Sequence, residues 1–306
     1  MRFINLRTMT DEACISSPTV LCLGNFDGVH IGHRQLVDSV HQNYERLKAS
    51  IPSLKRGAWF FDSNSYKSAT EIYSLDEKLS VFSELGLDYA IIADFNSIRS
   101  LSPTEFVNDI LIGDCKCVHA VCGENFRFGS RAIGDCSSLI ELMGGNVSVI
   151  PLLSKGDTVV SSTYIRTLLS EGNILLANEL LGEKYSINET VVHGKALGRT
   201  IGIPTINQYV KNKTMILKNG IYGTLCTIDS KKYFGVTNVG TRPTVEDDGA
   251  KNVETHIIDF NDDCYDKNVK VEFIFRIRDE MKFDSVESLS SQIFNDINTV
   301  RAYFYN

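Results

Sequence analysis

The alternation of apolar strands with amphipathic helices over residues 1–183 constrains the fold of this chain more than any other feature. The stretch 19–26, TVLCLGNF, has the length and composition of a buried strand, and apolar side chains recur at helical spacing through residues 33–49. Further strands are predicted at 57–62, 88–95, 117–123 and 147–153, and further helices at 74–86, 102–111 and 161–182. Strands separated by helices pair in parallel, so we expect a parallel sheet with helices on its faces.

One helix start in this half carries a complete set of signals. Ser102 is the expected cap of the helix in SPTEFVNDIL, Pro103 occupies its first turn, and Glu105 completes a capping box.

The pattern changes near residue 183. Short strand-like segments, separated by Gly, Asn and Asp turns, cover 185–194, 220–229, 231–240, 252–260 and 268–278. Such a run predicts a small antiparallel barrel or sandwich. One helix ends the chain, with Asp284 and Glu287 as its expected capping pair. Its expected buried stripe consists of Val286, Leu289, Ile293, Ile297 and Val300.

The length and net charge of the chain limit the classes of protein to which it can belong. A chain of 306 residues exceeds the usual size of one core, so we predict two domains, 1–183 and 184–306. The net charge of −7 argues against a general nucleic-acid or membrane-surface binder. The N-terminus has no basic-then-apolar signal pattern, and no apolar run approaches the roughly 18 residues of a spanning helix. We expect a cytoplasmic protein, a monomer or weak homo-oligomer, with no nucleic-acid or membrane partner.

Three of the eight cysteines gather in CKCVHAVCG, residues 115–123. Cys115, Cys117 and Cys122 surround His119, which raises the possibility of a zinc site. The Cys-x-Cys spacing is not the usual Cys-x2-Cys, and no second ligand pair follows at a typical distance. A strand whose cysteines act as small buried apolar residues is the simpler interpretation.

The stretch LCLGNFDGVHIGH, residues 21–33, ends a strand in glycines and two histidines. His30 and His33 lie where the strand meets the next helix, and ligands bind at the carboxyl ends of such strands. Free N–H groups and the helix dipole favour anions there, and imidazoles can donate to phosphate oxygens. Glycines that let a ligand approach the backbone are Gly24, Gly28 and Gly32. One packed and one solvated histidine is the alternative; we favour a phosphate site.

The stretch SSTYIR, residues 161–166, places hydroxyls and an arginine at the start of a helix. Ser161, Ser162 and Thr163 can cap that helix or bind phosphate, and Arg166 offers a fixed fork of donors. Simple capping with a surface arginine is the alternative.

The stretch GENFRFG, residues 123–129, has the composition of an exposed turn. Asn125 can hydrogen-bond a base or ribose edge, whereas Phe126 and Phe128 are expected to pack. Arg127 and Arg131 could bind phosphate, with solvated charges as the alternative.

In the second half, GKALGRTIGIPTIN, residues 194–207, combines glycines with two cations and a proline. A glycine-rich flap with Lys195 and Arg199 can wrap a triphosphate. Thr205 and Asn207 lie two apart in an extended segment, so both project to one face and offer oxygen ligands to a hard cation such as Mg²⁺. A polar turn before an edge strand is the alternative.

In VETHIIDF, residues 253–260, strand alternation divides the side chains between two faces. One face is expected to carry Glu254, His256 and Ile258, and the other Val253, Thr255 and Ile257. A glutamate among apolar neighbours costs free energy unless it is paired or used, so Glu254 is a candidate functional residue.

These motifs resemble, in order, those of the bacterial bifunctional riboflavin kinase/FMN adenylyltransferases, also called FAD synthetases. GNFDGVHIGH is similar to the His-x-Gly-His signature of nucleotidyltransferases, and GENFRFGSRAIGD and SSTYIR resemble that half's other motifs. GKALGRTIGIPTIN is similar to the kinase motif with the core Pro-Thr-x-Asn. NVGTRPT at 238–244, VETHIIDF and IRDEMKF at 277–283 also fit, so the resemblance covers essentially the whole chain.

The resemblance implies an α/β nucleotidyltransferase domain, Rossmann-like with a parallel sheet, and a small antiparallel β-barrel riboflavin kinase domain with a terminal helix. It implies phosphorylation of riboflavin to FMN with ATP and Mg²⁺, then adenylylation of FMN by a second ATP to FAD and pyrophosphate. It gives catalytic roles to His30, His33, Arg166 and Glu254, the last as general base on the riboflavin 5′-hydroxyl. It gives ATP or phosphate binding to Gly24, Asn25, Asp27, Gly32, Asn125, Ser161, Ser162, Thr163, Gly194, Lys195, Gly198 and Arg199. It gives metal binding to Thr205 and Asn207, and flavin contact to Arg278, for which a surface salt bridge is the alternative.

The chain departs from the family pattern at two turns. Asp62, Ser63, Asn64 and Ser65 stand where the family has a Phe-x-Pro-His-Pro-like turn, and DCYDKN lacks the usual glycine after its tyrosine. Three alternatives stay open: a protein that is mainly a riboflavin kinase with a weakened adenylyltransferase domain, a non-catalytic flavin or nucleotide sensor, and an adenylyltransferase for another small phosphate, such as a pantetheine or nicotinamide nucleotide.

Overall fold

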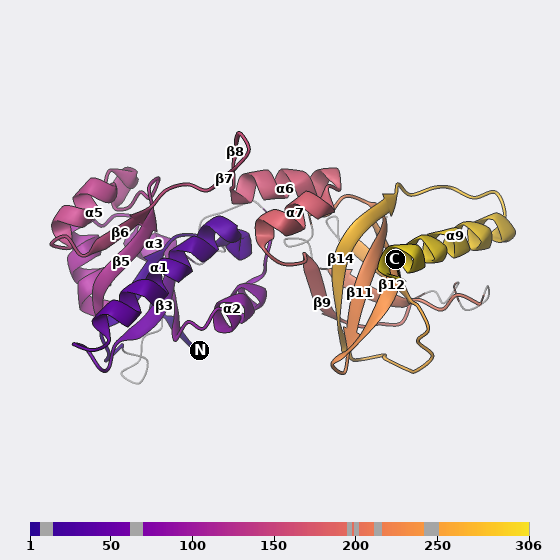
Figure 1. Cartoon of the computed structure of the whole chain (residues 1–306), viewed down its shortest axis with the longest axis horizontal. Coiled ribbons are helices and arrows are strands. Elements are labelled where there is room, and N and C mark those ends of the chain that lie inside the picture. The colour runs from indigo at the N-terminus through magenta and orange to yellow at the C-terminus, as the bar shows by residue number, and fades with distance from the viewer. Residues whose placement is uncertain are drawn as a thin grey trace. The chain divides into compact units, whose positions relative to one another are not determined.

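The computed structural model describes residues 1–6, 15–61, 70–194, 198, 202–210, 216–241 and 251–305 (Figure 1). The chain forms two compact units, one of Met1–Ala69 and Tyr73–Ser162 and the other of Thr70–Ile72 and Thr163–Asn306. Apart from residues 70–72, the chain passes from the first unit to the second between Ser162 and Thr163. The domain boundary expected at 183 stays a prediction. No helix among the described residues is long and apolar enough to span a membrane.

A six-stranded parallel sheet forms the centre of the first unit, in the spatial order β1-β4-β3-β2-β5-β6. The strands are β1 (Arg2–Asn5), β2 (Thr19–Leu23), β3 (Lys55–Phe61), β4 (Tyr89–Ala93), β5 (Cys117–Gly123) and β6 (Val147–Ile150). Because β3 lies on one side of β2 and β5 on the other, the winding of the chain reverses at β2. In open α/β sheets ligands bind outside the carboxyl ends of strands at such a switch point.

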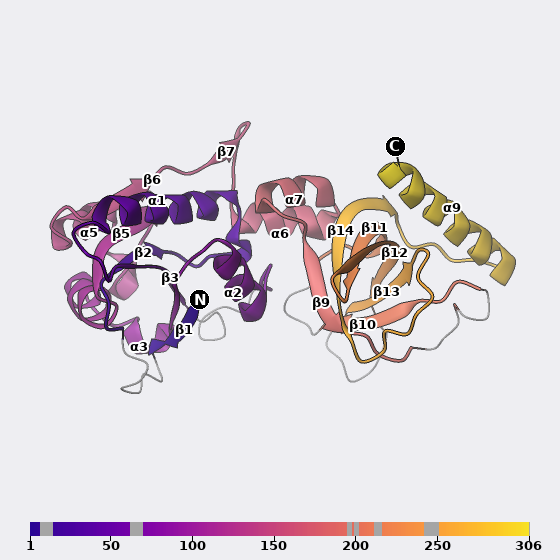
Figure 2. The same cartoon turned by 60° about the horizontal axis from the view of Figure 1, so that its bottom comes forward.

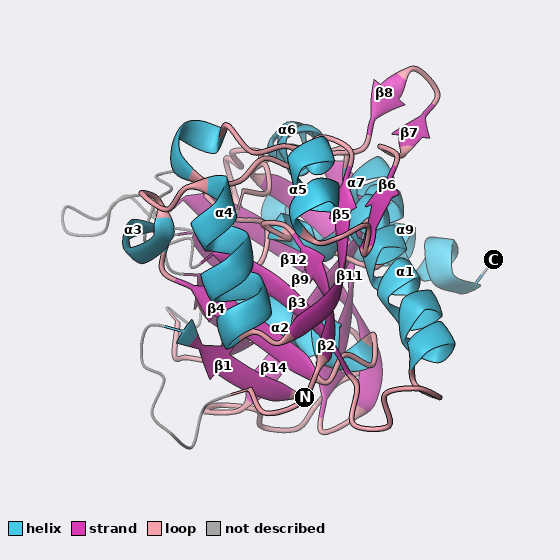
Figure 3. Cartoon of the chain, turned by 90° about the vertical axis from the view of Figure 1, so that its left-hand side faces the viewer, coloured by secondary structure: helices cyan, strands magenta, loops and turns pink. Residues whose placement is uncertain are grey.

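Helices cover both faces of this sheet (Figure 3). They are α1 (Ile31–Leu47), α2 (Leu75–Glu84), α3 (Phe95–Ile98), α4 (Pro103–Glu105), the π-helix η5 (Phe106–Asp114) that continues α4, and α5 (Cys136–Leu142). Helix α1 packs on β2, β3 and β5, while η5 buries Phe106, Val107 and Leu111 in the cluster around Trp59. The capping box is confirmed: Ser102 Oγ accepts from Glu105 N, and Glu105 Oε2 accepts from Ser102 N.

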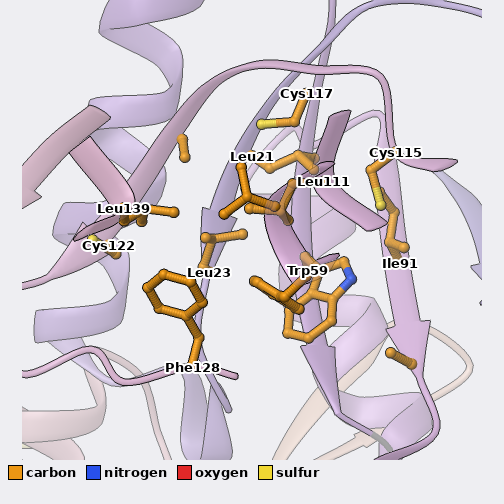
Figure 4. Close-up of a cluster of buried hydrophobic side chains, with 14 of the residues drawn as sticks. Leu21, Leu23, Trp59, Ile91, Leu111, Cys115, Cys117, Cys122, Phe128 and Leu139 are labelled. Atoms are coloured by element: carbon orange, nitrogen blue, oxygen red, sulfur yellow. The ribbon is translucent and has the colours of Figure 1, made fainter. Parts of the chain in front are cut away.

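The cysteines of residues 115–123 are part of the apolar core (Figure 4). Cys115, Cys117 and Cys122 lie among Leu21, Leu111 and other apolar side chains, and burial raises the pKa of the Cys117 thiol to about 12. The Nε2 atom of His119 lies 2.9 Å from Ser148 Oγ, a hydrogen-bond distance. The interpretation of these cysteines as small buried apolar residues is confirmed.

The second unit contains α6 (Ser162–Glu171) from Thr163 on, then α7 (Ile174–Leu181) and an antiparallel barrel. Its strands follow the order β10-β13-β12-β11-β14-β9. They are β9 (Ser186–Thr190), β10 (Ile206–Val210), β11 (Gly220–Ile228), β12 (Lys231–Thr241), β13 (Lys251–Ile257) and β14 (Asn268–Arg278). The buried Gln208 joins the two end strands, because its Nε2 donates to Glu189 O and Val269 O, each at 2.7 Å.

The alternation predicted for residues 253–257 is confirmed in β13. Val253, Thr255 and Ile257 are buried, and Thr255 extends a hydrogen-bonded row of hydroxyls across neighbouring strands. Glu254 and His256 are half-buried and line a cavity on the other face. The register therefore turns Val253, Thr255 and Ile257 into the barrel and leaves Glu254 and His256 on the side of the cavity.

The terminal helix α9 (Val286–Tyr305) lies along the outside of the barrel (Figure 2). The predicted cap is wrong by one position: Ser285 and Ser288 exchange the capping hydrogen bonds, with Ser288 N donating to Ser285 Oγ at 3.1 Å. The helix starts at Val286, so Asp284 lies one residue too early to cap it.

The predicted stripe of α9 is only partly buried. Ile297 and Val300 pack in a cluster with β11, β12 and β14, but Val286 is 57% exposed. Leu289 and Ile293 are half-buried and line a cavity, and Ile293 also packs against the edge of that cluster.

Candidate active sites

The chain leaves β2 through a turn with unusual backbone angles. Phe26 and Val29 have φ values of 51° and 37°, in the left-handed region that non-glycine residues rarely adopt. The buried ring of Phe26, packed against Phe60 and Phe82, holds this conformation. Strain of this kind persists only where surrounding packing fixes it, and it gathers at functional sites.

His30 caps α1 and has a defined tautomer. Its Nδ1 accepts a hydrogen bond from His33 N at 3.3 Å, so the ring proton lies on Nε2. Burial, opposed in part by the charge of Asp27, lowers the pKa of His30 to about 4. His30 is therefore neutral near pH 7 and carries a single N–H donor.

The structure brings the two histidines of this turn together. The rings of His30 and His33 stack with centroids 3.6 Å apart and an interplanar angle of 16°. A Cβ at position 32 would lie 3.3 Å from the His30 ring, so Gly32 leaves room for that ring as well as for the backbone. Two stacked imidazoles of this kind avoid mutual repulsion because His30 is neutral.

The motif after β5 follows the strand beside β2, at the same edge of the sheet. Phe128 pairs with Gly134 to close a small hairpin, and Phe126 stacks on Phe128, so their predicted packing role is confirmed. Asn125 and Arg127 are exposed, as is Arg131. Asn125 is thus available to a ligand, and the exposed arginines fit the solvated alternative.

The start of SSTYIR is tied to the β2 turn. Ser162 Oγ donates to Asp27 O at 2.8 Å, and both residues belong to the first unit. Thr163 and Arg166 follow in α6, where Arg166 Nη1 lies 3.4 Å from Thr163 Oγ1. One of the hydroxyls expected to cap or bind phosphate thus fixes the turn that carries His30.

A cavity of about 400 Å³ lies between the outer face of the barrel and the first half of α9. Glu254 and His256 of β13 line it, and apolar side chains of α9 such as Leu289 and Ile293 add an apolar surface. The remaining lining residues are Gly198, Ile203, Thr205, Ile221, Val236, Asn238, Arg278, Glu280, Met281, Phe283, Val286 and Asp296. An apolar cavity with a few convergent polar groups is the usual form of a small-molecule site.

A second cavity of about 330 Å³ meets the first at Thr205. It is lined by Val191, Pro204, Thr205, Ile206, Thr255, Ile257, Phe260, Asn261, Asp262, Asp263, Cys264 and Tyr265. Asn207, two residues after Thr205, is buried in β10 and pairs in register with Glu254. The oxygen of Thr205 lies beside both cavities and that of Asn207 is buried close by in sequence; hard oxygen ligands of this kind suit Mg²⁺, which takes few protein ligands.

Two glycines of the predicted flap are held by close packing. A Cβ at Gly194 would overlap the Asn207 amide, and a Cβ at Gly198 would overlap the carbonyl oxygen of Ile203. Ile203 N donates to Gly198 O at 2.8 Å. Lys195 and Arg199 lie outside the described residues, as do Asp62, Ser63, Asn64 and Ser65 of the altered turn.

His256 is a residue whose role the sequence did not indicate, although strand alternation put it on the face of Glu254. Its Nδ1–H donates to Pro204 O at 2.8 Å, which ties β13 to the segment that carries Thr205. Burial lowers the pKa of His256, so the neutral form makes this hydrogen bond.

Arg278 lines the α9 cavity and also forms an ion pair. Its Nη2 and Nε reach Asp296 Oδ2 at 2.7 Å and Oδ1 at 3.0 Å, and Asp296 is only 2% exposed. The salt bridge named as an alternative is therefore present, but to a buried partner on α9. Contact between Arg278 and a flavin stays a prediction.

Each half of the chain matches a known protein family. A family model described as FAD synthetase matches residues 13–164, and one described as riboflavin kinase matches residues 181–304. The bifunctional riboflavin kinase/FMN adenylyltransferase of Bacillus subtilis (strain 168) is 32% identical over 295 residues, covering 94% of this chain and 93% of the relative. The enzyme of the same name from Escherichia coli (strain K12) is 33% identical over 312 residues, covering 98% and 96%.

One solved structure matches over nearly the full length. The crystal structure of a macrolide-efflux protein from Streptococcus pneumoniae has a TM-score of 0.87 and 29% sequence identity, and the match covers 98% of each chain. The likeness shows that both units share their fold with that protein.

Proposed function

This chain belongs to the family of bifunctional riboflavin kinase/FMN adenylyltransferases, and we propose that its two halves perform the two steps of FAD synthesis with separate sets of residues. Both the kinase and the FAD synthetase domain are present. The second half phosphorylates riboflavin to FMN, and the first half adenylylates FMN to FAD. The residue assignments below are the proposal. A cytoplasmic location and the oligomeric state stay predictions of the sequence.

In the kinase half, Glu254 acts as the general base. It accepts the proton of the riboflavin 5′-hydroxyl while that oxygen bonds to the γ-phosphorus of ATP, and ADP leaves. The observation that carries this assignment is that Glu254 faces a cavity whose α9 side is apolar, as a flavin ring requires, and which meets a second cavity at Thr205. The flavin would occupy the α9 cavity, beside Arg278, and the nucleotide would occupy the other.

Thr205 and Asn207 would hold Mg²⁺ through their side-chain oxygens. Mg²⁺ held there would supply positive charge against the negative charge that develops on the phosphate oxygens during transfer. The flap residues Gly194 and Gly198 keep the backbone close to Asn207 and Ile203, and Lys195 and Arg199 supply cations for the triphosphate.

In the adenylyltransferase half, an FMN phosphate oxygen attacks the α-phosphorus of ATP, and pyrophosphate leaves. Neutral His30 donates its Nε2–H to a phosphate oxygen, and His33 and Arg166 stabilise further negative charge. Nucleotide binding falls to the backbone and side chains around the two histidines and the neighbouring motifs: Gly24, Asn25, Asp27, Gly32, Asn125, Ser161, Ser162 and Thr163. The protein chiefly positions the reactants and stabilises charge.

The test separates the two steps by chromatography of FMN and FAD after incubation with riboflavin, ATP and Mg²⁺. His33→Ala should lower FAD formation from FMN at least about a hundredfold and leave FMN formation from riboflavin unchanged. Glu254→Gln should lower FMN formation by about 10²–10⁴ and leave FAD formation from supplied FMN unchanged. If either variant loses neither step, the assignment is wrong. The rate at which the wild-type protein converts FMN to FAD also shows how active the first half is with its altered turn at 62–65.

A further inference from the structure

Asn252 lies two residues before Glu254 on the same face of β13. Its Nδ2 donates a hydrogen bond to Glu254 Oε1 at 2.8 Å. Within the described ranges this is the one hydrogen bond recorded for the Glu254 carboxylate. A carboxylate only accepts, so the atom of Asn252 that faces it must be the amide nitrogen.

The rest of the Asn252 side chain makes no hydrogen bond among the described residues. Its Oδ1 is buried without a partner, so the amide does not belong to a larger polar network in that part of the chain. The residue in register on β12 is Gly240, which has no side chain to compete for the space. A buried amide that leaves its oxygen unpaired is costly, and the bond to Glu254 is the interaction that accounts for its presence.

We propose that Asn252 is a positioning residue for the kinase step, a role that rests on the proposed function of Glu254 as general base. Asn252 occupies Oε1 of Glu254 and fixes the rotamer of the carboxylate. Oε2 is then the atom that accepts the proton of the substrate hydroxyl, while the hydroxyl oxygen bonds to the γ-phosphorus and the bond to the ADP leaving group breaks.

The physical basis is conformational. A free glutamate side chain has three rotatable bonds, and a held carboxylate does not have to be ordered again in the transition state. Loss of the donor should therefore reduce the rate of the kinase step.

Two isosteric substitutions test the hydrogen bond itself. Asn252→Leu removes the donor, and Asn252→Asp replaces it with a negative charge beside Glu254. Both should lower the kcat of riboflavin phosphorylation about ten- to hundredfold with little change in the KM for riboflavin. A residue that only fills space would tolerate the isosteric Leu, so a wild-type kcat for Asn252→Leu would overturn the proposal.

Other ionisable side chains also line the cavity, namely His256, Arg278, Glu280 and Asp296. All four are present in every variant, so the comparison with wild type isolates the change at Asn252. Asn188→Leu, at an exposed asparagine of β9 in the same barrel, is the matched control and should leave kcat and KM unchanged. The rate of FMN adenylylation, measured on the same samples, should stay at the wild-type value in all variants.

A double variant separates this proposal from the assignment of the base. If Glu254→Gln keeps full kinase activity, the proposed function of Glu254 fails. If Glu254→Gln is inactive but Asn252→Leu has the wild-type kcat, only the positioning role fails. When both roles hold, adding Asn252→Leu to Glu254→Gln should cause no further loss, because Asn252 acts through the carboxylate. An additive loss would overturn the positioning role.

Discussion

The tautomer and charge of individual histidines in this protein are determined by the atoms that they contact. His30 accepts from His33 N at Nδ1, and burial keeps the ring neutral; His256 donates from Nδ1 to Pro204 O. The two residues therefore have opposite tautomers, and each leaves one ring nitrogen with a defined role. Their titration and their hydrogen-bonding partners are the properties to test at this scale.

His30 should make the first unit less stable as the pH falls. The unfolded chain binds a proton at the ordinary histidine pKa of about 6.5, whereas folded His30 binds one only near pH 4, so unfolding takes up a proton between these values. Stability from this residue is complete above about pH 6.5 and is lost as the pH falls towards about 4, by about 3 kcal/mol in total. An NMR titration of the His30 ring should show a midpoint near 4.

The matched variant for this effect is His30→Asn, which keeps a capping acceptor and does not titrate. Its urea unfolding should show a smaller loss of stability over the same pH range. A His30 midpoint near 6.5 would contradict the explanation.

His256 should control metal use in the kinase step through Pro204. His256→Phe removes the donor that holds the segment before Thr205, and we expect the Mg²⁺ concentration for half-maximal riboflavin phosphorylation to rise about tenfold. His256→Asn keeps a donor and should lie closer to wild type. Equal Mg²⁺ dependence in Phe, Asn and wild-type proteins would show that the contact does not position the metal ligands.

Among the secondary-structure elements, α9 has two different functions along one apolar stripe. Its second half packs Ile297 and Val300 into the cluster with the barrel strands, while Leu289 and Ile293 of its first half face the cavity. The ion pair between Arg278 and Asp296 lies between these halves and fixes the helix against β14. The same spacing of apolar residues thus packs against the barrel at one end of the helix and lines a cavity at the other.

This division predicts opposite results for two similar substitutions. Leu289→Ala should raise the KM for riboflavin several-fold with a small effect on unfolding, because its side chain lines the cavity and lies outside the cluster. Ile297→Ala should lower the free energy of unfolding of the barrel by about 2–4 kcal/mol with a smaller effect on KM. Steady-state kinetics and urea unfolding on both variants check this. Phe294→Ala, at a ring 54% exposed on α9, is the control for both measurements.

In the whole molecule, the catalytic groups assigned to the two steps belong to different parts of the chain. His30 and His33 follow β2 of the parallel sheet, and Glu254 lies on the barrel. A chain with one inactive step should therefore still perform the other.

Mixing two inactive variants tests this independence. Neither His33→Ala nor Glu254→Gln alone should convert riboflavin to FAD, but an equimolar mixture should do so after a lag in which FMN accumulates. Chromatography over time distinguishes the products, and wild-type protein at the same site concentration is the control. If the mixture makes FMN but no FAD, free FMN does not reach the second site and the two steps are not independent.

The sequence by itself determined the elements, because their signals are local. The period of apolar residues predicted most strands and helices but not β1, Ser102 and Glu105 predicted a capping box, and alternation put Glu254 and His256 on one face of β13. The position of His30 and His33 between a strand and the next helix also followed from strand–helix order, although that strand is β2 and not the first of the sheet. The cap of α9 was misplaced because Asp284 and Ser285 are both good capping residues, and only backbone geometry selects between them.

The tertiary structure decided everything that depends on residues far apart in the chain. The strand order that puts the winding reversal at β2, the cavity between β13 and α9, and the pairing of Arg278 with Asp296 all require long-range contacts that a periodic pattern does not encode. The stacking of His30 on His33 and the bond from Asn252 to Glu254 are short-range, yet they depend on rotamers that burial selects. The period of apolar residues determines which face of an element a side chain lies on. Packing against distant residues determines its rotamer, and so which of its atoms faces a neighbour or a cavity.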